Sequence, residues 1–205
     1  MRQRPNLVVA AIALILAVLV ASCSGSSTKT SNASTTTAGG GVDPNAPEVV
    51  APGDIPDDQV FVLYTAAVDG FSVNVPEGWA RSTADTTTTF TDHFNSVSTT
   101  MTNAPTAPTA ASARTTEVVA LRGGVPSFQL VKVETVRRAA GPAVLMTYRA
   151  GSTRDPVTGK RVALDVERYE FWRNGKQVTL TLSGARGSDN VDPWKTVTNS
   201  FAWTA

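Results

Sequence analysis

The sequence predicts an α+β fold: a mostly antiparallel sheet of about seven to eight strands, with a middle helix and a C-terminal helix packed on it. Alternating apolar segments are joined by Asp69-Gly70 and Asn174-Gly175, dipeptides that favour two-residue hairpin turns. Near the end of the chain Asp192-Pro193 is typical of a helix start, and the apolar residues of 194–201 recur at helical spacing. This terminal helix is expected to dock on the sheet and close the domain.

The first strands are expected over 60–67 and 71–75. In the second of these, apolar residues alternate with polar ones and therefore share one face. Trp79 follows a Pro-Glu-Gly turn and is expected to fill the end of the core. Two weaker strands are expected over 87–91 and 96–102, because these segments are rich in threonine, which favours strands.

Two prolines interrupt the chain before the middle helix, which is expected to begin after Thr109 and to run to Leu121. Its apolar stripe is thin, so the helix is expected to lie on the surface of the sheet. The stripe would consist of Ala111, Thr115, Val118 and Leu121.

The second half of the chain predicts four further strands, 128–136, 143–149, 161–173 and 176–183. Within the long third strand of this group the apolar residues change from even to odd positions. A bulge near Glu167-Arg168 would explain that change. Asp192 is expected as the N-cap of the last helix, with Pro193 at its first position.

The N-terminal segment has the layout of an export signal. Arg2 and Arg4 precede the uncharged apolar run Leu7–Ala21, which is short for a membrane span. Val20-Ala21-Ser22-Cys23 resembles a bacterial lipobox. That resemblance implies diacylglycerol on the Cys23 sulfur, cleavage before Cys23 and an acyl group such as palmitate on the new amino terminus. An uncleaved membrane helix and a plain secretory signal are the alternatives.

Three segments follow from this interpretation. Residues 1–22 form the signal peptide, and 23–58 form a Ser/Thr/Gly/Pro-rich tether that has too little apolar surface to fold. Residues 59–205 form one domain that is large enough for a single core. The mature protein would be held on the extracytoplasmic face of the cell membrane by the lipid on Cys23.

Composition excludes several classes of function. The chain has 18 Lys and Arg against 17 Asp and Glu, so it lacks the basic excess of a nucleic-acid-binding protein. Cys23 is the only cysteine, which excludes an intramolecular disulfide. His93 is the only histidine, which excludes a two-histidine metal site, and the sequence predicts no cofactor.

No motif of an enzyme active site is present, and no nucleophile elbow of the G-x-S-x-G type occurs. The chain is therefore expected not to be an enzyme. The alternative is an envelope hydrolase with an unconventional site, for which Asp92-His93 with Asp85 nearby is the candidate acid–base pair or weak metal site. The interpretation without a function is a polar histidine in a loop.

The segment Gly70–Trp79, GFSVNVPEGW, is similar to the opening of PsbP-like domains, an opening that several actinobacterial lipoproteins of the LpqN type share. The later strands and the terminal tryptophan-bearing helix are consistent with the same fold over 59–205. The resemblance implies a PsbP-like sandwich and a non-catalytic binding or assembly module, and it supplies no active-site residues.

A binding surface is the remaining functional expectation. Trp172 is the tryptophan most expected to be exposed, and the candidate rim consists of Trp172, Arg173, Lys176 and Arg161. The expected partner is an envelope protein or an amphiphile, and a lipid or amphiphile carrier is the alternative. The interpretation without a binding function is that the four tryptophans fill the core and that the basic residues lie at solvated ends of hairpins.

Overall fold

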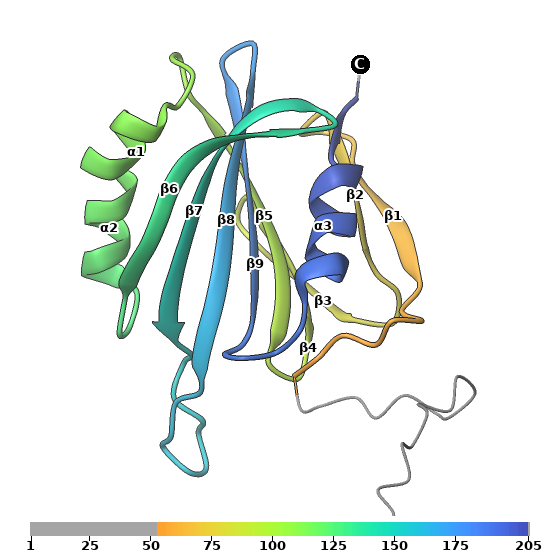
Figure 1. Ribbon diagram of the computed structural model, residues 1–205. Coiled ribbons are helices and arrows are strands. Elements are labelled where there is room, and N and C mark those ends of the chain that lie inside the picture. The colour runs from red at the N-terminus through yellow and green to blue at the C-terminus, as the bar shows by residue number, and fades with distance from the viewer. Residues whose placement is uncertain (1–52, 205) are drawn as a thin grey trace, which may run out of the picture. The chain divides into compact units, whose positions relative to one another are not determined.

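The protein is described from a computed structural model, in which residues 53–204 are described (Figure 1). The expected signal peptide, and the tether up to residue 52, lie outside these residues. Within residues 53–204 no helix is long and apolar enough to cross a membrane.

Two antiparallel sheets and three helices make up the domain, which confirms the predicted α+β class. The small sheet has the order β1-β2-β10, and its strands are β1 (Phe61–Ala66), β2 (Phe71–Pro76) and β10 (Ala202–Trp203). The large sheet has the order β3-β4-β5-β9-β8-β7-β6. Its strands are β3 (Ala80–Ala84), β4 (Thr87–Asp92), β5 (Asn95–Asn103), β6 (Gln129–Arg138), β7 (Gly141–Gly151), β8 (Ala163–Arg173) and β9 (Lys176–Ala185). The helices are α1 (Ala110–Thr115), α2 (Glu117–Gly124) and α3 (Val191–Ser200).

The main core lies between the large sheet and the layer formed by α3 and the small sheet; we call the side of the large sheet that faces this layer its inner face (Figure 1). Phe201, at the end of α3, is 1% exposed and lies between two other rings. Its ring centroid is 4.1 Å from that of Phe171 and 5.7 Å from that of Phe71. The predicted docking of the terminal helix is therefore confirmed.

The opposite, outer face of the large sheet is covered only in part. Helices α1 and α2 lie over the β6–β7–β8 side, where they enclose a second apolar cluster (Figure 1). The expected middle helix is divided at Thr116 into two short helices, α1 and α2. The hydroxyls of Thr115 and Thr116 both donate to the Ser112 carbonyl, at 3.0 and 2.8 Å, and so compete with the helical ladder.

This interruption also changes which residues the helices bury. Ala113 and Val118 are buried, whereas Ala111 and Thr115 of the expected stripe are exposed. The predicted start of the helix is confirmed, since Thr109 forms a capping box with Ser112.

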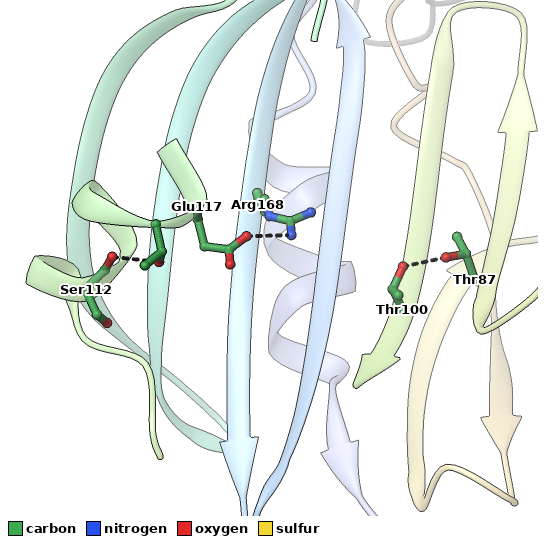
Figure 2. A network of polar contacts seen from close by, with 6 residues as sticks. Thr87, Thr100, Ser112, Glu117 and Arg168 are labelled. Carbon is green, nitrogen blue, oxygen red and sulfur yellow. Dashed lines mark hydrogen bonds and ion pairs between the residues drawn. The ribbon is translucent and has the colours of Figure 1, made fainter. Parts of the chain in front are cut away.

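The threonine-rich strands lie in the part of the large sheet whose outer face no helix within residues 53–204 covers. Hydroxyl side chains of β4, β5 and β9 line it, and some bond across strands: Thr87 Oγ1 is 2.7 Å from Thr100 Oγ1 (Figure 2). Strand β3 was not predicted. Its five residues are all exposed and lack the apolar alternation of a covered strand, as suits the edge of a sheet.

No bulge interrupts β8, so that prediction is wrong. Its register with β7 and β9 is continuous, and the irregularity lies instead in β6, between Leu130 and Lys132. The parity of the apolar residues changes because the two faces of β8 are covered at different points. Val166 packs under the helices of the outer face, whereas Tyr169 and Phe171 belong to the inner core.

Helix α3 begins two residues earlier than an Asp192 cap would place it, at Val191, and its N-cap is Asn190. The Asn190 side chain does not cap the helix, because it bonds elsewhere in the core. Its Oδ1 accepts from the Ile55 amide at 2.7 Å, and its Nδ2 donates to Asn95 Oδ1 at 3.0 Å. Ile55 is 4% exposed, so the packed part of the chain includes residues before the expected boundary at Gln59.

Candidate functional site

A buried carboxyl group without a hydrogen-bond partner marks the candidate site. Glu170 lies in the middle of β8 on the outer face, between Val144 of β7 and Thr179 of β9. It is 1% exposed, and its Oε1 atom has no partner among residues 53–204. Buried polar groups are normally hydrogen-bonded, so this atom needs an explanation.

Glu170 is a common wall of two cavities, which we call together the Glu170 cleft. Both cavities are also lined by Ala107 and Pro108, from the connection between β5 and α1. The smaller has a volume of about 90 Å³ and is completed on one side by the Trp172 ring. The larger, of about 350 Å³, extends towards Glu117 at the start of α2.

The charges around the cleft do not balance. Glu117 Oε2 accepts from Arg168 at 3.3 Å, and Figure 2 shows this pair bridging α2 and β8. Arg168 therefore forms an ion pair with Glu117, and Glu170 is a second carboxyl group near the same guanidinium. Burial, and to a smaller extent the negative charge of Glu117, raise the pKa of Glu170 to about 7, although the positive charge of Arg168 opposes the shift.

Trp172 fixes the wall opposite the helices. It lies two residues after Glu170 and therefore on the same face of β8. Its indole Nε1 donates to the Ala104 carbonyl at 2.7 Å, and the Ala104 amide donates to the Gly175 carbonyl at 2.8 Å. The connection that carries Ala107 is therefore attached to the β8–β9 hairpin.

The four residues of the expected binding rim do not lie together. Trp172 lines the Glu170 cleft, whereas Arg173 and Lys176 line a separate hollow of about 350 Å³ beside the β1–β2 turn. Arg161 precedes the other end of β8 and donates to the Ser152 carbonyl. Neighbouring strand residues point to opposite faces, which separates Trp172 from Arg173. Trp172 is half-buried, as are the other three tryptophans, so its exposure does not set it apart.

His93 occupies the turn between β4 and β5, with a φ of +49°. Its side chain is 82% exposed, and its Nδ1 is 2.9 Å from Asp92 Oδ1. It lines an open hollow of about 290 Å³ together with hydroxyl groups, among them Ser96 and Ser152. Within residues 53–204 no hydroxyl group is hydrogen-bonded to His93, although a histidine base would need such a bond to activate a nucleophile.

No group of three His, Cys, Asp or Glu side chains that could hold a metal ion occurs within residues 53–204. Sequence reasoning did not select Glu170 as a site residue. The available signal was its position between Tyr169 and Phe171, where a charged residue interrupts an aromatic run in a central strand.

No family model and no curated protein matches the sequence. Among solved structures the chain is similar to CyanoP, the cyanobacterial PsbP of Synechocystis sp. PCC 6803. The two are 20% identical with a TM-score of 0.52, over 74% of this chain and 98% of CyanoP. This similarity confirms the predicted PsbP-like fold.

Two further solved structures have TM-scores below 0.5. LpqN of Mycobacterium tuberculosis, which is involved in cell envelope biogenesis, is 12% identical with a TM-score of 0.43, over 76% of this chain and 90% of LpqN. The Ran-binding protein Mog1p of Saccharomyces cerevisiae is 9% identical with a TM-score of 0.45, over 71% of this chain and 96% of Mog1p.

Proposed function

We propose that this chain is a lipid-anchored protein of the cell envelope whose folded domain is a non-catalytic binding module. The Glu170 cleft, bordered by Trp172, is its binding site. The partner is an envelope protein or an amphiphile that inserts a small group into the cleft. The anchor is the lipid on Cys23, on the extracytoplasmic face of the membrane.

The observation that carries the proposal is the unpartnered Oε1 of Glu170. A buried polar atom without a partner costs about 1–3 kcal/mol, and more when it is charged. Apolar side chains, among them Ala107, Pro108 and Val144, line the smaller cavity beside this carboxyl group. A ligand that donates a hydrogen bond to Glu170 would recover this cost, and two cavities with room for it adjoin the side chain.

The composition of the cleft favours binding over catalysis. Its carboxyl group lies beside Trp172, and the nearby Ser112 hydroxyl is bonded to the Thr109 carbonyl at 3.1 Å. A hydroxyl nucleophile would need a base within hydrogen-bonding reach, and this hydroxyl serves the capping box instead. His93 lies in a different hollow, so the hydrolase alternative requires a second site that is separate from the cleft.

The location is supported by the N-terminal sequence. A lipobox cysteine followed by a Ser/Thr-rich segment would hold the domain near the membrane while leaving its orientation free. Such an arrangement suits the capture of partners close to the membrane.

The test is capture from detergent-solubilised envelope by the immobilised full chain, followed by identification of the retained molecules. Trp172→Ala should weaken retention because it removes one wall of the cleft, and His93→Ala, in the other hollow, is the matched control that should leave it unchanged. The same proteins are assayed with ester, glycoside and peptide substrates. Turnover that disappears in His93→Ala, without a partner that depends on Trp172, would overturn the proposal in favour of the hydrolase.

A further inference from the structure

The ligand chemistry of the Glu170 cleft follows from three features of its walls. They are the unpartnered buried carboxyl oxygen, the excess of negative charge, and the indole ring that closes the smaller cavity. We infer that the cleft binds a primary alkylammonium group, which donates hydrogen bonds to Glu170 and packs its alkyl chain beside Trp172. This inference rests on the function proposed above and names the class of its ligand.

Three ionisable groups, Glu117, Arg168 and Glu170, interact at the cleft. Arg168 pairs with Glu117 at 3.3 Å through one terminal nitrogen. Its positive charge lowers the pKa of Glu170, but no ion pair joins the two, and both Arg168 Nε and Glu170 Oε1 lack a partner within residues 53–204. An ammonium group would supply both the missing positive charge and the missing donors. Charge-assisted hydrogen bonds of this kind are about twice as strong as neutral ones.

The alternatives fit less well. A divalent metal ion would need further ligands, and no group of three candidate ligands occurs within residues 53–204. A guanidinium group is wide and planar, and it would make its best contact with a carboxylate that offers both oxygens. An anion would face two carboxylates, Glu117 and Glu170. A compact ammonium head with three donors suits a single buried oxygen.

Size and polarity support a short alkyl chain. The smaller cavity has a volume of about 90 Å³, which is room for a few heavy atoms. Apart from Glu170 and Thr135, its walls are the apolar surfaces of Ala, Pro and Val residues and the Trp172 ring. An aromatic ring beside a desolvated cation stabilises that cation where it lies over the ring face.

Binding should depend on pH, because the carboxyl group must be ionised to pair with the cation. The charged groups that face Glu170 are Glu117 from α2 and Arg168 from its own strand; its neighbours on β7 and β9, Val144 and Thr179, do not titrate. Ionisation of Glu170 is half complete at about pH 7. The affinity should therefore be about tenfold lower at pH 6 than at pH 8.

The experiment uses the full chain in detergent micelles, labelled with ¹⁵N at the tryptophan indoles. Four indole signals are expected from the four tryptophans, and the Trp172 signal is assigned by its loss in Trp172→Phe. This indole N–H donates to Ala104 beside the cleft and so reports on ligand entry. The probes are n-butylammonium, its neutral analogue n-butanol and its anionic analogue butyrate.

A saturable shift of the Trp172 signal is expected with n-butylammonium, with at least tenfold weaker binding in Glu170→Gln. Glu77→Gln, at an exposed carboxylate after β2, is the matched control and should bind as the unchanged chain does. A second pair of probes, Nα-acetyl-lysine methylamide and its norleucine analogue, identifies the source. Tighter binding of the lysine probe assigns the group to a peptide, and tighter binding of n-butylammonium assigns it to a small amine.

Two results would overturn the inference. One is equal binding of n-butanol and n-butylammonium, and the other is ammonium binding that Glu170→Gln leaves unchanged. In either case the ligand class would be wrong. If an envelope partner still required Trp172 for binding, the proposed function would nevertheless be supported. If no probe shifts the Trp172 signal and no envelope partner depends on Trp172, both the inferred ligand class and the proposed function are refuted.

Discussion

Replacing Glu170 with glutamine should stabilise the protein, by an amount that depends on pH. The pKa of Glu170 is about 7 in the fold, against 4.5 for an ordinary glutamate. Because the folded pKa is the higher one, the fold favours the protonated form. The stability associated with that proton is fully present below about pH 4.5 and is lost as the pH rises through 7.

The magnitude follows from the size of the shift. Each pKa unit corresponds to about 1.4 kcal/mol, so a shift from 4.5 to about 7 gives about 3 kcal/mol. Glutamine has the same shape and does not ionise. Glu170→Gln should thus be about as stable as the unchanged protein at pH 4.5 and about 3 kcal/mol more stable at pH 8.

The assay is urea unfolding at several pH values, followed by tryptophan fluorescence, on a fragment that spans the compact unit Asn45–Ala205. The difference between the two proteins isolates Glu170 from the other groups that titrate. Glu77→Gln, an exposed site, provides the control and should show no such dependence. A stability difference that stays constant from pH 4.5 to 8 would refute the view that Glu170 is buried and uncompensated.

Three further predictions concern the anchor and the core. Cys23→Ala should abolish lipid labelling and leave unprocessed precursor; normal processing and membrane attachment of this variant would contradict the lipobox. Phe201→Ala should cost about 3–5 kcal/mol in urea unfolding, because the ring lies between two others in the core, and a melting temperature within a degree of the unchanged protein would disprove that packing. Asn190→Ala should cost about 1–3 kcal/mol and expose the Ile55 amide to hydrogen exchange, whereas exposed Asn103→Ala should do neither; continued protection of Ile55 would be the contrary result.

Much of the fold could be predicted from local signals. The Asp69-Gly70 and Asn174-Gly175 turns both connect adjacent antiparallel strands, and the alternation in Phe71–Val75 places the apolar residues in the core. The docking of Phe201 followed from helical spacing alone. These features depend on neighbours in the sequence and on the periods of strand and helix, which a sequence displays directly.

The errors have a common cause, since each depends on contacts between distant segments. The parity change in β8 looked like a bulge, because the sequence does not show that different layers cover the two faces of that strand. Asn190 was not recognised as the N-cap of α3, because its side chain bonds to Ile55 and Asn95, which lie far away in the sequence. Strand β3 has no apolar face, so its pairing with β4 left no pattern to read.

The candidate site was predicted only in part. Trp172 was selected for its exposure, but its relevance lies in the cavity that it shares with Glu170. The grouping with Arg161 failed because the two lie towards opposite ends of β8. Glu170 itself became a candidate only when the structure showed both faces of its strand covered and its Oε1 without a partner.

The most direct measurement of the central claim is site-specific photocrosslinking in living cells. A photoreactive amino acid replaces Ala107, an exposed residue at the cleft, or Val157, a 90% exposed residue in the turn after β7. Binding in the Glu170 cleft predicts an adduct from position 107 that is lost when Glu170→Gln or Trp172→Ala is added, and no adduct from position 157. An adduct from position 157 alone, or one at 107 that survives both substitutions, would contradict it.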